Sequence, residues 1–375
     1  MNKKSFLLSI MLLAMPAMLL ANPITEAKAK QQAAQFLAQR MHSGARRAPL
    51  KGGTNLTLAG QTKGYYAYNI GRGNGFVMMS ASDRTQPILG YADEGQFNLS
   101  NAPQPLKQYV QRLSAIVEAA EQGNAQLAPR KSAAESRVAT PVSVAKNFVP
   151  TLVSCRWNQG SPYNLECPKY TDANGNQQTA ATGCVATAMA QIVYYWKWPK
   201  TTTTTMPAYT TNWNNQTVTY PEMAPTSFKW DKMSDVYNGN QSQESQQAVA
   251  HLMRALGHGA KMGYGPASGA NSGNAAAALR NYFGYDKTSF HTSHDKYTYT
   301  EWEDLIYNEL AAGRPVLMNG DNSDLTGGHE WVCDGYDGNG LFHMNWGWGG
   351  MCDGYFILTV MFPDQQGIGG STSSD

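Results

Sequence analysis

The spacing of apolar residues along the first part of the chain predicts a small unit of helices and strands. Apolar residues recur at helical intervals from Thr25 to Met41, and again after Pro105. Between these stretches, "YYAYNI" and "FVMMS" flank a glycine-rich turn at Gly71–Gly75, which predicts a β-hairpin. Residues from about 23 to 122 are therefore expected to form one α+β unit.

Further along the chain, helical periods come before strand periods. A helix is predicted from about Val185 to Trp198 and is stopped by Pro199. Its apolar face is expected to comprise Val185, Ala188, Met189, Ile192, Val193 and Trp196.

Three more helices follow before the pattern changes. The first two are predicted to end near Gly257 and Gly284, and Thr300 with Glu303 is expected to form the capping box of the third. Then the stretches "RPVLMNG", "HEWVCDGYDG", "LFHMNWGW" and "YFILTVM" predict strands joined by glycine-rich turns. They indicate an antiparallel meander or barrel.

The segment between the two regions, residues 123–147, shows no sustained period. It is rich in alanine, serine, proline and basic residues, which is typical of an exposed linker and of sites that proteases cut. Arg130, Lys131, Arg137 and Lys146 are candidate cleavage points. A simple interdomain tether has the same composition, and both interpretations remain open.

The first 21 residues change the expected location of the protein. Lys3 and Lys4 precede an apolar run from Phe6 to Leu20, and Ala21 supplies a small residue for cleavage. This pattern predicts a secretory signal peptide, and no later stretch is long and apolar enough for a membrane span. We therefore expect a secreted protein, extracellular or periplasmic.

The charge and the cysteine content of the chain exclude some classes of function. The formal net charge of +2, with 15% charged residues, provides no basic field for nucleic acid. The chain has five cysteines, and an exported protein built on disulfides would normally use an even number. An odd count leaves at least one free thiol, and the absence of a C-x-x-C pair argues against structural zinc.

Cys184 is the strongest candidate for a reactive thiol. In "ATGCVATAMA" it follows Gly183 and lies at the predicted start of a long helix, where the backbone dipole favours a thiolate. A buried cysteine that only fills the core would fit the same ten residues, so this stretch alone does not decide.

The strand region strengthens the case for catalysis. His329 follows two glycines at the start of a predicted strand, and Asn345 lies in the next strand. A thiol nucleophile needs an imidazole to take its proton, and an amide can orient that imidazole. Trp346 and Trp348 follow as apolar plates that could exclude water from the pair.

Several motifs together resemble the streptopain family of papain-like cysteine peptidases, which includes interpain. They are "TGCVATAMAQIVYYW", "GGHEWVCDGYDG", "HMNWGWGGMCDGYF", "WNQGSPYN" and "YGPASGANSG", and the resemblance covers about 145 to 365. It implies an α+β fold with a helical half, an antiparallel sheet half and a cleft between them. The preceding region is similar in size and organisation to the family's inhibitory propeptide.

The resemblance also implies roles for individual residues. Cys184 matches the nucleophile, His329 the general base and acid, and Gln159 the oxyanion-hole glutamine. Trp346 and Trp348 match the tryptophans beside the histidine. Papain-type enzymes have Asn-Ser-Trp where this chain has Asn-Trp, so either the Asn345 side chain or backbone near Trp346 would orient the imidazole.

Two further positions match the family's substrate-binding elements. Gly328 looks like a residue whose backbone lines the cleft. Ala270 stands where a serine is familiar, so the resemblance implies only a backbone contact there.

The sequence as a whole predicts a self-inhibited secreted endopeptidase that acts on proteins. The expected segments are a signal peptide (1–21), a propeptide (22–122) acting as intramolecular inhibitor, a cleaved linker (123–147) and a peptidase domain (148–375). No metal and no cofactor are expected. Two alternatives remain: a cysteine acyltransferase or amidase on the same scaffold, and a catalytically silent secreted binding protein.

Overall fold

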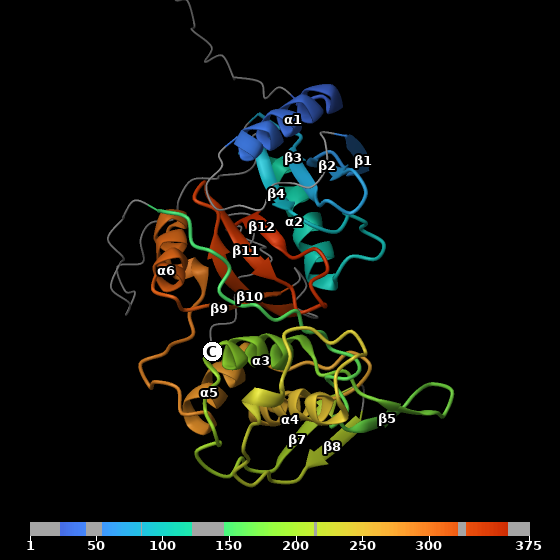
Figure 1. Cartoon of the computed structure of the whole chain (residues 1–375), viewed down its shortest axis with the longest axis vertical. Coiled ribbons are helices and arrows are strands. Elements are labelled where there is room, and N and C mark those ends of the chain that lie inside the picture. Colours follow the sequence, from blue (N-terminus) through green and yellow to red (C-terminus); the bar gives the residue numbers. More distant parts are fainter. Residues whose placement is uncertain are drawn as a thin grey trace, which may run out of the picture.

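The computed structural model describes residues 23–42, 55–83, 85–121, 146–213, 216–321 and 328–358. Figure 1 shows these residues in three parts along the longest axis: an N-terminal unit, a central sheet and a helical half. The predicted signal peptide, most of the predicted linker and the C-terminal residues lie outside the described residues. Among the helices that are described, none has the length and apolar character needed to cross a membrane.

The N-terminal unit has the predicted helices and hairpin. Helix α1 spans Glu26–His42 and helix α2 spans Gln104–Glu121. Four antiparallel strands lie between them: β1 Leu56–Gln61, β2 Tyr65–Ile70, β3 Phe76–Ser80 and β4 Ile88–Ala92. Strand β2 is buried on both faces rather than in strict alternation, because Ala67 and Tyr68 are neighbours and both lie in the core, whereas Tyr66 is half-buried.

The helical half is built around α3 (Cys184–Trp196), with α4 (Gln243–Gly259) and α5 (Ser272–Tyr282) packed against it. The prediction for the end of α3 is wrong by two residues, because Lys197 adopts a left-handed conformation with φ 47° and ends the helix. Trp196, placed on the buried face by periodicity, is 45% exposed. Buried residues run continuously from Val185 to Tyr194, so α3 is enclosed on all sides.

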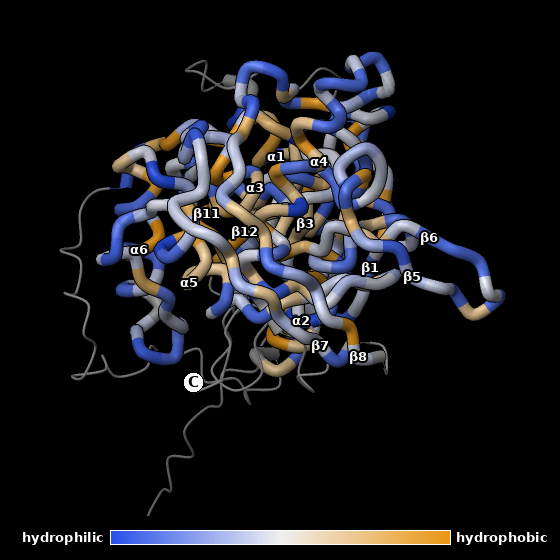
Figure 2. The backbone as a smooth tube through the Cα atoms, turned by 90° about the horizontal axis from the view of Figure 1, so that it is seen from below, coloured by the Kyte–Doolittle hydropathy of each residue, from blue (hydrophilic) through white to orange (hydrophobic). Residues whose placement is uncertain are grey.

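Smaller elements that periodicity did not reveal complete this half. They are the hairpin of β5 (Lys169–Thr171) and β6 (Gln177–Thr179), the hairpin of β7 (Tyr209–Trp213) and β8 (Gln216–Tyr220), and the 3₁₀ turns η1 (Trp230–Lys232) and η2 (His294–Lys296). Figure 2 shows the β5–β6 hairpin extending outward as a largely hydrophilic segment.

The capping box of α6 (Tyr299–Ala311) lies two residues before the predicted one. The Thr298 hydroxyl accepts the N–H of Glu301, and the Glu301 carboxylate accepts the N–H of Thr298. The pair has the same three-residue spacing as Thr300 and Glu303, so the sequence contained two candidate boxes and the earlier one caps the helix.

The sheet half is the predicted antiparallel meander of β9 (Val316–Asp321), β10 (Gly328–Tyr336), β11 (Leu341–Asn345) and β12 (Gly354–Ile357). Alternate residues of β10 serve two cores. Trp331 and Cys333 belong to the core shared with the N-terminal unit, whereas Val332 belongs to the core of the helical half. Strand β10 is therefore the wall between the two halves.

The sheet does not stop at β12 but continues into the N-terminal unit, giving the order β1-β2-β3-β4-β12-β11-β10-β9 (Figure 1). At the seam, Tyr355 pairs with Tyr91 and Phe356 with Gly90. A Cβ on Gly90 would lie 2.5 Å from the Phe356 ring, and a Cβ on Gly354 would lie 2.4 Å from the Tyr91 carbonyl oxygen. Two glycines thus permit the close approach that joins the N-terminal unit to the sheet half.

Candidate active site

Cys184 is the first residue of α3, and two separate structural constraints favour glycine at the preceding position, Gly183. Its φ of 84° and ψ of 150° lie in a region that side-chain-bearing residues rarely adopt. A Cβ at this position would also lie 2.9 Å from the carbonyl oxygen of Ser268. The backbone therefore turns sharply into the helix and presents the Cys184 side chain, which is half-buried, at its N-terminal end.

Two threonines hold this turn. The Thr187 hydroxyl donates to the Gly183 carbonyl at 2.9 Å and shares a hydrogen bond of 2.8 Å with the Thr182 hydroxyl. Both threonines are fully buried. The start of α3, which carries the thiol, is consequently fixed from inside the protein.

The Cys184 sulfur meets strand β10 at Glu330. The backbone N–H of Glu330 donates to the sulfur, as does that of Val185, and both contacts favour the thiolate. Burial has the larger effect and raises the pKa of the Cys184 thiol to about 11, with the Glu330 carboxylate contributing in the same direction. In this conformation the thiol is therefore neutral at pH 7.

His329 immediately precedes Glu330 in β10 and pairs with Gly320 of β9. Burial lowers the pKa of its imidazole to about 4, and its buried Nδ1 atom has no hydrogen-bond partner among the described residues. Within the described residues, no hydrogen bond joins the imidazole to the Cys184 sulfur. The alternation of side chains along β10 accounts for the absence of this hydrogen bond. Glu330 lies on the same face of the strand as Val332, which belongs to the core of the helical half, whereas His329 lies on the same face as Trp331.

Gln159 is held next to the segment that leads into Cys184. Its backbone carbonyl accepts the N–H of Thr182 at 3.0 Å, two residues before the cysteine. Its half-buried side-chain amide makes no hydrogen bond with any residue that the structure describes. Backbone contacts thus fix the segment while the amide stays available to a ligand.

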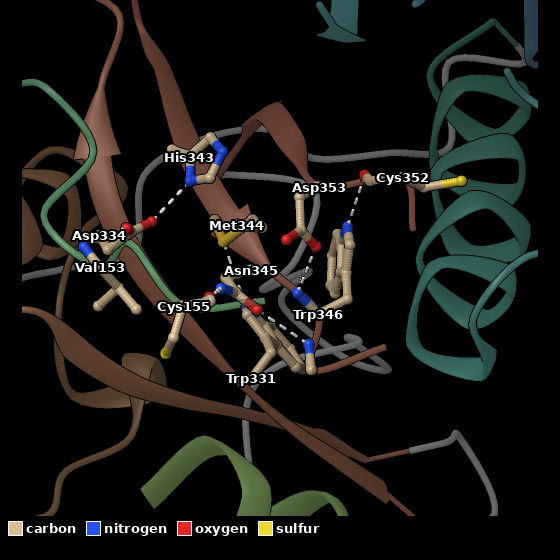
Figure 3. Close-up of polar contacts among 11 residues, drawn as sticks. Val153, Cys155, Trp331, Asp334, His343, Met344, Asn345, Trp346, Cys352 and Asp353 are labelled. Carbon is tan, nitrogen blue, oxygen red and sulfur yellow. Dashed lines mark hydrogen bonds and ion pairs between the residues drawn. The ribbon is translucent and has the colours of Figure 1, made fainter. Parts of the chain in front are cut away.

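Asn345 is engaged away from His329. Its Nδ2 donates to the Cys155 carbonyl at 2.9 Å, and its Oδ1 accepts the Gly347 N–H at 3.1 Å (Figure 3). Asn345 pairs with Val332, three residues beyond His329 in β10. In this conformation the amide fixes the turn that carries the two tryptophans rather than the imidazole.

Trp346 is fixed within the core that the sheet shares with the N-terminal unit. Its backbone N–H donates to Asp353 Oδ1 at 2.9 Å, and its ring lies 5.4 Å from that of Trp331 (Figure 3). The ring of Tyr109, from α2, also packs against it, with 6.2 Å between the ring centroids. Trp348 is half-buried, and its Nε1 has no hydrogen-bond partner among the described residues.

Cys352, in the same loop, is also buried. Its side chain is 7% exposed because it faces the N-terminal unit, where the sulfur donates to the Gln96 carbonyl. All five cysteines are free, so Cys155 and Cys167 do not form a disulfide.

The two predicted substrate-binding positions lie in different halves of the peptidase region, one in the sheet and one among the helices. Gly328 is exposed at the start of β10. Ala270 is half-buried in the loop that precedes α5, and this loop contacts the approach to Cys184 through a hydrogen bond from Ala181 N–H to the Gly265 carbonyl at 3.2 Å.

Sequence reasoning missed Glu330, although the signal was present. In "GGHEWV" a carboxylate directly follows the predicted base, and strand alternation places it on the opposite face, toward α3. It also left unassigned the contact between His343 and Asp334, whose Nδ1 and Oδ1 lie 2.6 Å apart (Figure 3). Burial opposes the charged form of His343, but the Asp334 carboxylate prevails and raises the pKa of the imidazole.

Comparison with known proteins agrees with this arrangement. Residues 157–356 match the Peptidase C10 family, and residues 21–117 match the family described as Spi protease inhibitor. The chain is 32% identical to streptopain of Streptococcus pyogenes, over 99% of this chain and 96% of that protein. It is also 32% identical to the thiol protease/hemagglutinin PrtT of Porphyromonas gingivalis, over 98% of this chain but 42% of that protein.

Two solved structures are similar to this fold. A mutant fragment of prointerpain A from Prevotella intermedia matches with a TM-score of 0.68 and 28% identity, covering 84% of this chain and 96% of the fragment. Active interpain A from the same organism matches with a TM-score of 0.51 and 34% identity, covering 58% of this chain and 90% of that protein. The chain belongs to the Peptidase C10 family, is a cysteine-type peptidase, and carries a Spi-type inhibitor domain in its N-terminal part.

Proposed function

We propose that the chain is the precursor of a secreted cysteine endopeptidase, with Cys184 as the nucleophile and His329 as the base and acid. The observation that carries this proposal is the contact between the first turn of α3 and β10, where the Glu330 N–H meets the Cys184 sulfur. This contact brings the thiol to the residue adjacent to His329, although 145 positions separate the two in sequence.

The proposed chemistry uses each group in turn. His329 takes the Cys184 proton, and the thiolate attacks the substrate carbonyl carbon. The backbone N–H of Cys184 and the Gln159 amide hold the resulting oxyanion. His329 then protonates the leaving amine, and water hydrolyses the acyl-enzyme on Cys184.

The described conformation fits a latent precursor. A neutral thiol and a neutral imidazole that are not hydrogen-bonded cannot act as an ion pair. The N-terminal unit supports this state, because it extends the sheet at β12 and packs Tyr109 on Trp346 near the tryptophan loop. Removal of the unit would release β12 and that loop, and would let His329 reorient toward the thiol.

We further propose that activation cleavage falls before Lys146. Lys146 Nζ lies 2.5 Å from Asp304 Oδ1, and the Asn147 N–H donates to the Tyr307 hydroxyl at 2.8 Å. Both contacts bind the start of this segment to α6 of the peptidase half. The predicted domains thus become a propeptide of about 22–122, a cleaved linker, and a peptidase domain that includes Lys146; a signal peptide of residues 1–21 would direct export.

The Cys184→Ala variant tests this function. We expect the purified variant to remain a full-length precursor and to release no peptides from denatured casein, because it lacks the nucleophile. Cys167→Ala is the matched control, since Cys167 is a buried thiol of the helical half. That control should mature and digest casein, and a peptidyl epoxide should label Cys184 in it.

Spontaneous maturation of Cys184→Ala would contradict self-processing. Casein hydrolysis by a fully processed Cys184→Ala enzyme would contradict the role of the nucleophile. Amine incorporation without peptide release by the wild-type enzyme would instead favour an acyltransferase.

A further inference from the structure

Gln191 is a fully buried amide of α3 that the proposed mechanism does not use. It lies about two turns beyond Cys184, on the same side of the helix. Its Oε1 accepts the Trp157 N–H at 3.4 Å and the weak S–H donor of Cys155, whose sulfur is 3.9 Å away. Its Nε2 is buried and has no hydrogen-bond partner among the described residues. The helix that carries the nucleophile therefore contacts the segment 155–157.

The segment that Gln191 contacts leads directly to Gln159. Trp157 is fully buried, so its backbone N–H cannot reach water, and the acceptor that the structure gives it is Gln191. The Trp157 carbonyl accepts the Gly349 N–H at 2.8 Å, and the Gln159 carbonyl accepts the Thr182 N–H at 3.0 Å. The position of Gln159 thus depends on the contacts of Trp157 as well as on its own.

Asn345 holds the same segment from the sheet half. Its Nδ2 donates to the Cys155 carbonyl, and its Oδ1 accepts the Gly347 N–H (Figure 3). Gly347 in turn lies against Gln191, because a Cβ at that glycine would be 3.9 Å from Nε2. Two buried amides, one from each half, consequently hold residues 155–157 between α3 and the turn after β11.

This arrangement bears on the oxyanion site, because its two proposed donors belong to different segments. The Cys184 N–H belongs to α3, whereas the Gln159 amide belongs to the segment that Gln191 contacts. Such donors are effective only if their spacing is fixed before the substrate reacts. The unpaired Nε2 of Gln191 has a cost in free energy, and conflicts of this kind are expected mainly at functional sites.

We propose that Gln191 is a positioning residue of the peptidase site: through Trp157 it sets the Gln159 amide against the backbone N–H of Cys184. The inference rests on the proposed function and adds a residue to its oxyanion site. A residue that only stabilised the core would also lower the free energy of unfolding when replaced, but its effect on turnover would not depend on Gln159.

A double-mutant cycle with Gln159 separates these roles. Gln191→Met keeps the length of the side chain and removes the oxygen that accepts the Trp157 N–H. Each precursor is matured with affinity-tagged wild-type enzyme, which is then removed, and rates on a fluorogenic peptide are normalised to Cys184 titrated with a peptidyl epoxide. We expect kcat to fall about tenfold in Gln191→Met with KM nearly unchanged, because a misplaced oxyanion donor acts in the transition state. Adding Gln191→Met to Gln159→Ala should then cause less than about a twofold further loss.

Two further variants control for packing. Gln191→Glu keeps an oxygen in the same place, and burial keeps its carboxyl group protonated, so it should retain most of the wild-type kcat. Ile192→Val removes a methylene group from the next residue of α3, which is also buried, and should lower the melting temperature without changing kcat.

An additional tenfold loss when the two substitutions are combined would contradict the inference, because independent effects multiply. An unchanged kcat in Gln191→Met or in Gln159→Ala would contradict it too, as would loss of titratable Cys184 in both Gln191 variants, which would show a role in folding alone. Each of these results leaves the proposed function standing if the wild-type enzyme digests casein. Absence of Cys184-dependent hydrolysis by the wild-type enzyme would instead contradict the proposed function, and the inference with it.

Discussion

Cys184 and His329 are brought to the same region but are held in forms that cannot react. Burial raises the pKa of the thiol to about 11 and lowers that of the imidazole to about 4. The uncharged forms are therefore favoured throughout the neutral range, and transfer of a proton between them is uphill. The proposed mechanism requires a change around these two residues that reverses both pKa shifts.

Gln159 offers a test of the oxyanion site that does not depend on the nucleophile. Gln159→Ala removes a side-chain amide that makes no hydrogen bond within the described part of the chain, so the fold should be unaffected. We expect turnover to fall by roughly 10²–10³, as when one oxyanion donor is lost elsewhere. Casein hydrolysis normalised to titrated Cys184 measures the effect, and an unchanged rate would remove Gln159 from the site.

The turn into α3 is the local structure on which the site depends most. Gly183 combines a backbone conformation open mainly to glycine with a close approach to Ser268. Gly175, in the β5–β6 hairpin, also has a positive φ, of 83°, but has no atom within 4 Å of a hypothetical Cβ. Substitutions at these two glycines can therefore separate the free-energy cost of the backbone conformation from the cost of the steric contact.

This difference predicts unequal effects of alanine. Gly175→Ala should lower the free energy of unfolding by about 1 kcal/mol with normal activity. Gly183→Ala should cost about 3 kcal/mol or more and reduce Cys184 labelling, because the clash is with backbone. Denaturant unfolding and epoxide titration provide the two readouts, and equal losses for both variants would contradict the close contact.

The seam between β4 and β12 should control latency. Gly90→Ala places a methyl group against Phe356 and should weaken the attachment of the N-terminal unit without changing the mature enzyme. Precursor maturation followed on a gel should then proceed several-fold faster. Gly73→Ala, at a glycine with a φ of 76° but no atom within 4 Å of a hypothetical Cβ, strains the backbone of the same unit without a clash at the seam, and is the control for strain alone. Equal maturation rates of the two variants would contradict the role of the seam.

Local sequence patterns predicted the helices and strands well, but they predicted the long-range contacts between them less well. Periodicity placed α1 and α2 because each buries one regular face. It placed Trp196 on the buried face, because the exposure of that residue depends on where Lys197 ends α3. It placed the capping box of α6 two residues late, because two residue pairs have the same spacing. It missed the short hairpins, whose strands have little hydrophobic period.

The same limit applies to the candidate site. Cys184, His329 and Gln159 could be predicted as candidate site residues because their motifs are long and their residue types are chemically distinctive. The engagement of Asn345 with Cys155 and Gly347 depends on how two distant segments meet at β11, which no local pattern encodes. Burial of Cys352 likewise depends on the N-terminal unit that covers it.

In the molecule as a whole, the N-terminal unit is part of the peptidase fold. One hydrophobic core runs from the N-terminal helices through the sheet to α6, so the N-terminal unit shares the interior of the peptidase instead of resting on its surface. Ion pairs at its edge, such as Arg156 with Glu94, add surface contacts. Loss of this unit would uncover apolar surface and a strand edge, and this change is large enough to alter the surroundings of His329.

The pH dependence of Cys184 alkylation tests the central claim most directly, namely that Cys184 and His329 become a reactive pair only when the N-terminal unit leaves. In the full-length chain, the rate with iodoacetamide should stay low at pH 7 and rise toward pH 11, because thiolate forms only as pH passes the raised pKa. In the matured wild-type enzyme, reactivity should persist below about pH 7, as for thiolates paired with imidazolium. His329→Ala matured by added wild-type enzyme should lose that neutral reactivity, whereas identical profiles for all three forms would contradict the account.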